Sequence, residues 1–180
     1  ADALPVLCRV IHTTADFSYR DTLTITDGAI EKAKEAIRRG FPIITDTTMA
    51  ASGINKTAAG KFGINVHCFI GDEDVKAAAK ESGMTRSAVS AEKAARLYPE
   101  CIYAVGNAPT ALMRLYELIE EKKIRPALII GVPVGFVNVV EAKELILRTD
   151  VPAIVARGRK GGSNIAAAIC NALLYEAGGR

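Results

Sequence analysis

The sequence predicts an α/β fold in which a three-layer, mostly parallel sheet of six strands carries helices on both faces. Three apolar runs, at 101–105, 127–130 and 153–156, are too short for helices and are typical of buried parallel strands. Each run breaks into a loop that contains glycine or proline and then reopens as a helical pattern. The 180 residues and the 49% hydrophobic content are sufficient for one domain, residues 1–180, with a sizeable core.

Strands and helices alternate along the rest of the chain. Short apolar or β-branched runs predict strands at 7–11, 42–45, 64–70, 102–105, 127–130 and 153–155. Helical patterns between and after them predict helices at 28–39, 72–82, 85–97, 110–123, 136–147 and 163–176.

Residues at the helix ends support four of these predicted helices. Gly40 and Gly83 follow the first two helical patterns, Tyr98-Pro99 stops the third, and Pro109 suits the first turn of the fourth. The last helix is small and apolar nearly all round, which predicts a place in the core or at a subunit contact.

Composition excludes several classes of protein. The net charge of +3, from 23 basic and 20 acidic residues, is too small for a typical nucleic-acid-binding protein. No apolar run approaches the ~20 residues that span a bilayer, and no signal segment opens the chain, so we expect a cytoplasmic protein with no membrane partner. The four cysteines form no C-x-x-C pair, which favours buried free thiols over a zinc or thioredoxin-like site.

Common cofactor and metal motifs are also missing. Residues 53–61 partly match a phosphate loop, but Asn55 stands at the required glycine position and Phe62 replaces the hydroxyl residue that would hold magnesium. No G-x-G-x-x-G follows a strand, no G-x-S-x-G occurs, and the two histidines lack metal-binding spacing. The sequence therefore predicts no cofactor and no metal.

The loops at 106–110, 131–135 and 158–163 follow predicted parallel strands. Ligands of open parallel sheets bind outside the carboxyl ends of the strands, where backbone donors and helix N-termini converge. Three such loops predict a broad ligand with several anionic groups. Four cations between 148 and 160 against a single acid fit carboxylates or phosphates, and the alternative is solvated charge around a turn.

Few side chains suit acid-base chemistry. His12 ends the first predicted strand, a place where catalytic groups belong, whereas His67 lies in an apolar run and is typical of a core histidine. Arg86 stands at a helix start, where a cation opposes the dipole; it is either functional or paired with an acid such as Glu92. Asp46 follows a strand and either caps the next helix or holds a ligand.

Six motifs in order match one family. They are Arg9-Val10-Ile11-His12, Ile44-Thr45-Asp46-Thr47-Thr48-Met49, Thr85-Arg86-Ser87, Gly106-Asn107-Ala108-Pro109-Thr110-Ala111-Leu112, Gly131-Val132-Pro133-Val134-Gly135-Phe136-Val137 and Gly158-Arg159-Lys160-Gly161-Gly162-Ser163. With these motifs the chain resembles the precorrin-8X and cobalt-precorrin-8 methylmutases of cobalamin biosynthesis. The fourth and fifth motifs are the most specific.

The resemblance implies an isomerase. Members move a methyl group from carbon 11 to carbon 12 of a corrin-type macrocycle, a 1,5-sigmatropic shift that forms hydrogenobyrinic or cobyrinic acid without an external cofactor. The resemblance implies that His12 is the proton donor and acceptor. It implies that the tetrapyrrole polycarboxylate is bound by Arg9, Thr47, Met49, Arg86, Ser87, Asn107, Thr110, Gly135, Arg159, Gly161, Gly162 and Ser163.

Two other functions remain alternatives at this point. One is an inactive tetrapyrrole-binding relative, which the presence of His12 disfavours. The other is a methyltransferase that uses S-adenosylmethionine, which the lack of a glycine-rich loop after the first strand disfavours. The family pattern also has a serine where this chain has Ala142, and the stretch 13–16 is more similar to cobalt-pathway members. The small final helix and the apolar 131–137 loop predict a homodimer.

Overall fold

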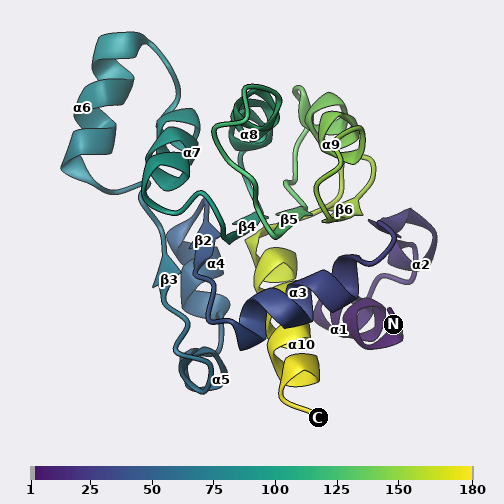
Figure 1. Cartoon of the computed structure of the whole chain (residues 1–180). Helices are drawn as coiled ribbons and strands as arrows, with labels where there is room; N and C mark the ends of the chain where they lie inside the picture. Colours follow the sequence, from purple (N-terminus) through teal and green to yellow (C-terminus); the bar gives the residue numbers. More distant parts are fainter. Residues whose placement is uncertain (1–2, 180) are drawn as a thin grey trace.

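A single sheet organises the computed structural model, which describes residues 3–179. Its strands are β1 (Leu23–Ile25), β2 (Ile43–Thr45), β3 (Val66–His67), β4 (Ile102–Val105), β5 (Leu128–Gly131) and β6 (Ala153–Ala156). They are ordered β1-β6-β5-β4-β2-β3 (Figure 1). Only β1 runs antiparallel to its neighbour, so the prediction of a mostly parallel six-stranded sheet is confirmed.

Helices cover both faces of this sheet, as predicted (Figure 1). One face carries α1 (Leu4–Thr14), α3 (Ala29–Arg38), α4 (Thr48–Gly53), α5 (Lys56–Gly60) and α10 (Ser163–Ala177). The other carries α6 (Glu73–Ser82), α7 (Arg86–Leu97), α8 (Pro109–Glu120) and α9 (Val139–Leu147). The short α2 (Tyr19–Thr22) leads into β1. Successive strand residues alternate between the two cores: Ile43 packs on the first face and Ile44 on the second.

The predicted strand at 7–11 is wrong, because these residues lie within α1. Val6 and Val10 are spaced four residues apart and are fully buried, whereas Arg9 and His12 are exposed. This 3.6-residue periodicity places one face of α1 against the core that contains α10. The sixth strand is instead β1, an edge strand that pairs antiparallel with β6.

Other boundaries also differ from the prediction, among them the end of α8, which lies at Glu120 and not at residue 123. β3 is limited to Val66–His67. α9 begins at Val139 because Asn138 takes a left-handed conformation with φ of 57°, so Phe136 and Val137 remain in an exposed loop. α10 lies buried in the core of the first face, which decides between the two places predicted for it.

The cysteines divide into two groups. Cys101 and Cys170 are buried free thiols, and burial raises the pKa of each to about 12. Cys68 is half-buried, whereas Cys8 is exposed on the outer side of α1, so the prediction of buried thiols is wrong for Cys8. Among residues 3–179, no helix has both the length and the apolar character needed to cross a bilayer.

Candidate functional site

The carboxyl ends of the parallel strands β2, β4, β5 and β6 lie at one edge of the sheet. The chain leaves β2 toward the face of α4 and leaves β4 toward the face of α8. The topology therefore changes direction between these two neighbouring strands, which is where ligands of open α/β sheets bind.

A carboxylate of the chain itself occupies this switch point. Buried Asp46 accepts hydrogen bonds from the backbone N–H groups of Gly106, Asn107 and Ala108, each at 2.8 Å. Burial raises the pKa of Asp46, and these three hydrogen bonds oppose the rise. The amide donors of this loop, which we expected to bind a substrate anion, are therefore already satisfied.

Asp46 does not cap α4 either. The N-cap is Thr47, whose Oγ1 accepts from the N–H of Ala50 at 3.1 Å. Asp46 therefore orders the loop after β4, whereas Thr47 caps the start of α4.

Thr47 also joins the loop after β2 to the start of α10. Its Oγ1 lies 2.7 Å from Oγ of Ser163, the first residue of α10. Gly106 packs against the same point, because a Cβ at this position would lie 2.5 Å from the Cα of Ser163. The structure therefore brings together Thr47, Ser163 and the loop that contains Asn107.

The loops after β5 and β6 are in direct backbone contact. The N–H of Gly162 donates to the carbonyl of Val132 at 2.8 Å, and the N–H of Gly135 donates to the carbonyl of Arg159 at 3.2 Å. Gly161 has no room for a side chain, because its Cβ would lie 2.1 Å from the carbonyl oxygen of Val132. The predicted residues Gly135, Arg159, Gly161 and Gly162 therefore belong to one continuous surface.

The end of α1 reaches this surface from the side. Lys160 Nζ lies 2.6 Å from Asp16 Oδ2 and 3.0 Å from Ser18 Oγ. The hydrogen bond from Lys160 lowers the pKa of Asp16 to about 2. His12 is exposed in the last turn of α1, so it stands at the end of a helix and not, as predicted, at the end of a strand.

The start of α7 flanks the opposite side. Thr85 Oγ1 donates to Thr110 Oγ1 at 2.9 Å, which places Arg86 and Ser87 beside the start of α8. Arg86 is exposed and, among the residues that the structure describes, forms no ion pair. The alternative pairing with Glu92 is wrong.

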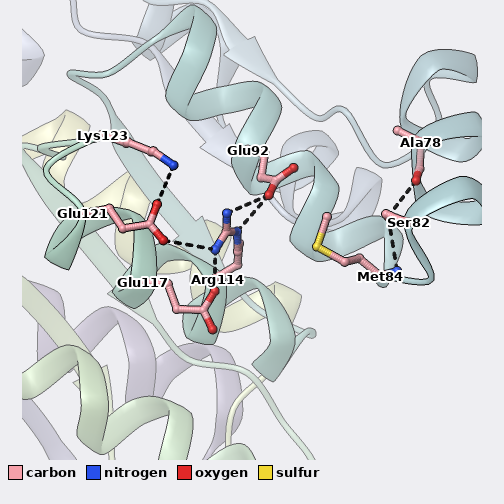
Figure 2. Close-up of polar contacts among 8 residues, drawn as sticks. All are labelled: Ala78, Ser82, Met84, Glu92, Arg114, Glu117, Glu121 and Lys123. Atoms are coloured by element: carbon pink, nitrogen blue, oxygen red, sulfur yellow. Dashed lines mark hydrogen bonds and ion pairs between the residues drawn. The ribbon is translucent and has the colours of Figure 1, made fainter.

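Glu92 instead binds Arg114 of α8 (Figure 2). Arg114 Nη2 lies 2.8 Å from Glu92 Oε1, and its Nη1 lies 2.5 Å from Glu117 Oε2. The side chain of Arg114 is mostly buried, so solvent screens this pair less than a surface ion pair. The network joins α7 to α8 and so holds the two helices whose first turns carry Arg86 and Thr110.

Arg9 lies apart from the loops, whereas His67 ends β3 beside the end of β2, where its carbonyl lies 3.4 Å from Thr45 Oγ1. The guanidinium of Arg9 stacks 5.3 Å from the ring centroid of Tyr175, which lies about 18 Å along α10 from Ser163 at a rise of about 1.5 Å per residue. His67 stacks on Tyr98 with centroids 4.8 Å apart, but it is half-buried and so is not the core histidine that we expected.

Lys143 is a functional candidate that the sequence reasoning missed. It is fully buried in α9, where its Nζ donates to the carbonyls of Gly158 at 2.7 Å and Lys160 at 2.9 Å. A signal was present in the sequence, because Lys143 shares the apolar face of this helix with Val139 and Ile146.

The chain is similar to known proteins along nearly its whole length. The precorrin-8X methylmutase family model matches residues 1–176. Cobalt-precorrin-8 methylmutase of Leptospira interrogans is 46% identical over 177 residues, covering 94% of this chain and 80% of the relative. Cobalt-precorrin-8 methylmutase of Salmonella typhimurium is 47% identical over 172 residues, covering 95% of this chain and 80% of the relative.

The fold is shared with a solved structure. Precorrin-8X methyl mutase from Thermus thermophilus matches with a TM-score of 0.91 and 39% identity, covering 98% of this chain and 86% of that one. The chain therefore belongs to the precorrin-8X methylmutase family and is a methylmutase, an isomerase of corrin biosynthesis.

Proposed function

We propose that this protein moves a methyl group from carbon 11 to carbon 12 of precorrin-8 or cobalt-precorrin-8. The observation that carries the proposal is the continuous surface at the carboxyl edge of the sheet, where motif residues from four loops and two helix starts meet. A macrocycle with several carboxylate arms needs donors distributed over a wide surface, and this edge provides them.

Exposed cations stand at both sides of this surface. Arg86 lies beside Thr110, and Arg159 lies in the loop after β6. Between them the paired hydroxyls of Thr47 and Ser163 offer neutral donors. Because guanidinium groups bind carboxylates through charge-assisted hydrogen bonds, we propose that Arg86 and Arg159 bind different carboxylate arms of one substrate.

Exposed apolar side chains lie in the first turn of α4 and in the loop after β5. Met49 is 69% exposed, Phe136 is 86% exposed and Val137 is 77% exposed. Large exposed apolar groups that cluster at a site indicate a binding surface. We propose that Met49 contacts the apolar ring system while the cations bind its periphery.

Incubation with substrate tests the activity. We expect purified protein to convert precorrin-8, supplied with and without cobalt, into product with a changed visible spectrum, because the methyl shift alters the chromophore. The two substrates compared at equal concentration decide the metal preference, and the two relatives named for cobalt-precorrin-8 favour the cobalt form. Binding without a spectral change in folded protein would indicate an inactive tetrapyrrole-binding relative instead.

We also propose a homodimer. The sequence predicted the dimer from the last helix and from the 131–137 loop. α10 is buried within the chain, but the apolar side chains of Val134, Phe136 and Val137 are exposed and so are available for a subunit contact. Light scattering at micromolar concentration is expected to give twice the chain mass of 19.1 kDa, and Phe136→Asp is expected to lower it. A wild-type mass of one chain would contradict the proposal.

The location that we propose is the cytoplasm. The buried Cys101 and Cys170 are free thiols, and a reducing compartment keeps thiols unpaired.

A further inference from the structure

Lys143 is unusual because its charged group is enclosed by the protein. Among residues 3–179, Lys143 and Asp46 are the acidic or basic side chains that are buried. Lys143 is 0% exposed, and burial lowers its pKa to about 8. A buried charge is a weak source of stability compared with an apolar residue of similar volume.

The hydrogen bonds of Lys143 surround Arg159. Its Nζ donates to the carbonyl on each side, those of Gly158 and Lys160, while the carbonyl of Arg159 accepts from Gly135. Three successive carbonyls of the loop after β6 are therefore fixed. Two side-chain ion pairs also hold this segment, Arg157 with Glu144 and Lys160 with Asp16, and both are partly exposed and so are screened by solvent.

We propose that Lys143 is a positioning residue for substrate binding. It holds the backbone at 158–160 in the conformation that presents Arg159 to a carboxylate arm, and it does so from the opposite side of the loop without touching substrate. This inference rests on the proposed function, because it takes the loop after β6 as part of the substrate site.

Three variants separate positioning from simple stability. Lys143→Met keeps the aliphatic length and removes both hydrogen bonds, whereas Lys143→Gln keeps an amide donor near the loop. Ile146→Val is the matched control, because Ile146 is also fully buried in α9 and lies outside the loop contact. It loses packing without loss of a hydrogen bond.

One measurement follows the opening of the loop, and a second follows the binding of ligand. Trypsin cleavage after Arg157, Arg159 and Lys160, followed by mass spectrometry, measures how often the loop opens. Titration with cobyrinic acid measures affinity. We expect Lys143→Met to raise both the cleavage rate and the Kd by about tenfold, the size expected when a charge-assisted hydrogen bond is lost. We expect Lys143→Gln to recover part of both effects and Ile146→Val to change neither.

Loop cleavage in Lys143→Met at the wild-type rate overturns the proposal, and so does a looser loop with unchanged affinity for cobyrinic acid. Should Lys143→Met fail to fold, Lys143→Gln alone carries the comparison with Ile146→Val. If wild-type protein binds neither cobyrinic nor hydrogenobyrinic acid, the proposed function fails and Lys143 loses its role in substrate binding. The cleavage rates then still show whether Lys143 holds the loop.

Discussion

Asp46→Ala is expected to lower the free energy of unfolding by about 3–6 kcal/mol. The carboxylate of Asp46 accepts three backbone hydrogen bonds from 106–108 in a buried setting. Alanine leaves these N–H groups without an acceptor, at about 1–3 kcal/mol for each buried donor, and removal of the buried carboxylate offsets part of that sum. The loss approaches the whole stability of a typical domain, which is about 5–15 kcal/mol.

The measurement is denaturant unfolding followed by circular dichroism. Asn107→Ala is the control, because its side chain is exposed in the same loop and its removal is expected to change stability by no more than about 0.5 kcal/mol. Asp46→Asn should fall between the two, since an amide keeps one acceptor oxygen but turns an NH₂ group toward N–H donors. Equal denaturation midpoints for Asp46→Ala and Asn107→Ala would show that Asp46 does not hold this loop.

The role of Asp46 illustrates what the sequence could not predict. Its partners lie 60 to 62 residues away in the chain, and only the parallel pairing of β2 with β4 brings them together. From the sequence, a carboxylate after a strand is an ordinary capping residue, and a glycine loop before a helix is an ordinary anion site. The structure joins the two and so satisfies both within the chain.

The central strands were predictable for a physical reason. β4, β5 and β6 are buried on both faces, so their sequences are continuous apolar runs that end at loop residues. Helix starts could also be predicted where the capping residue is adjacent to the helix in the sequence. Thr85 is an example, because its Oγ1 accepts a hydrogen bond from the N–H of Ala88.

The N-terminal part was not predictable in the same way. The run at 7–11 has the length of a strand and the spacing of a helix, and its packing against α10 decides the outcome. β1 is only partly buried at every residue, so it lacks the apolar pattern that marked the other strands. Tertiary contact, rather than local preference, determines both elements.

The other prediction with a large expected effect concerns His12. We expect His12→Ala and His12→Phe to lower kcat by about 10²–10⁴-fold, the usual contribution of a general acid or base. The methyl shift rearranges carbon atoms and π-electrons without a net change in protons. A proton therefore accelerates it only by withdrawing electron density from the migrating system in the transition state.

His12→Ala and His12→Phe should both bind cobyrinic acid with the affinity of the wild-type protein. His12 is exposed at the end of α1, so its replacement disturbs no core packing. A loss in kcat with an unchanged Kd for cobyrinic acid is the mark of an interaction made only in the transition state. His67→Ala is the matched control, because the second histidine stacks on Tyr98 and Phe69. Its removal is expected to reduce stability while kcat stays near the wild-type value.

Replacement by phenylalanine distinguishes proton transfer by His12 from a role in which only the position of its ring matters. Imidazole is the side chain that changes charge near neutral pH, and a general acid must carry its proton at the start of the reaction. His12→Phe keeps a ring at this position without a proton to transfer, so its residual rate should be as low as that of His12→Ala. If His12→Phe turns over substrate at near the wild-type rate with its fold intact, His12 transfers no proton. The rate would then come from orientation of the macrocycle and from fixed charges such as Arg86 and Arg159.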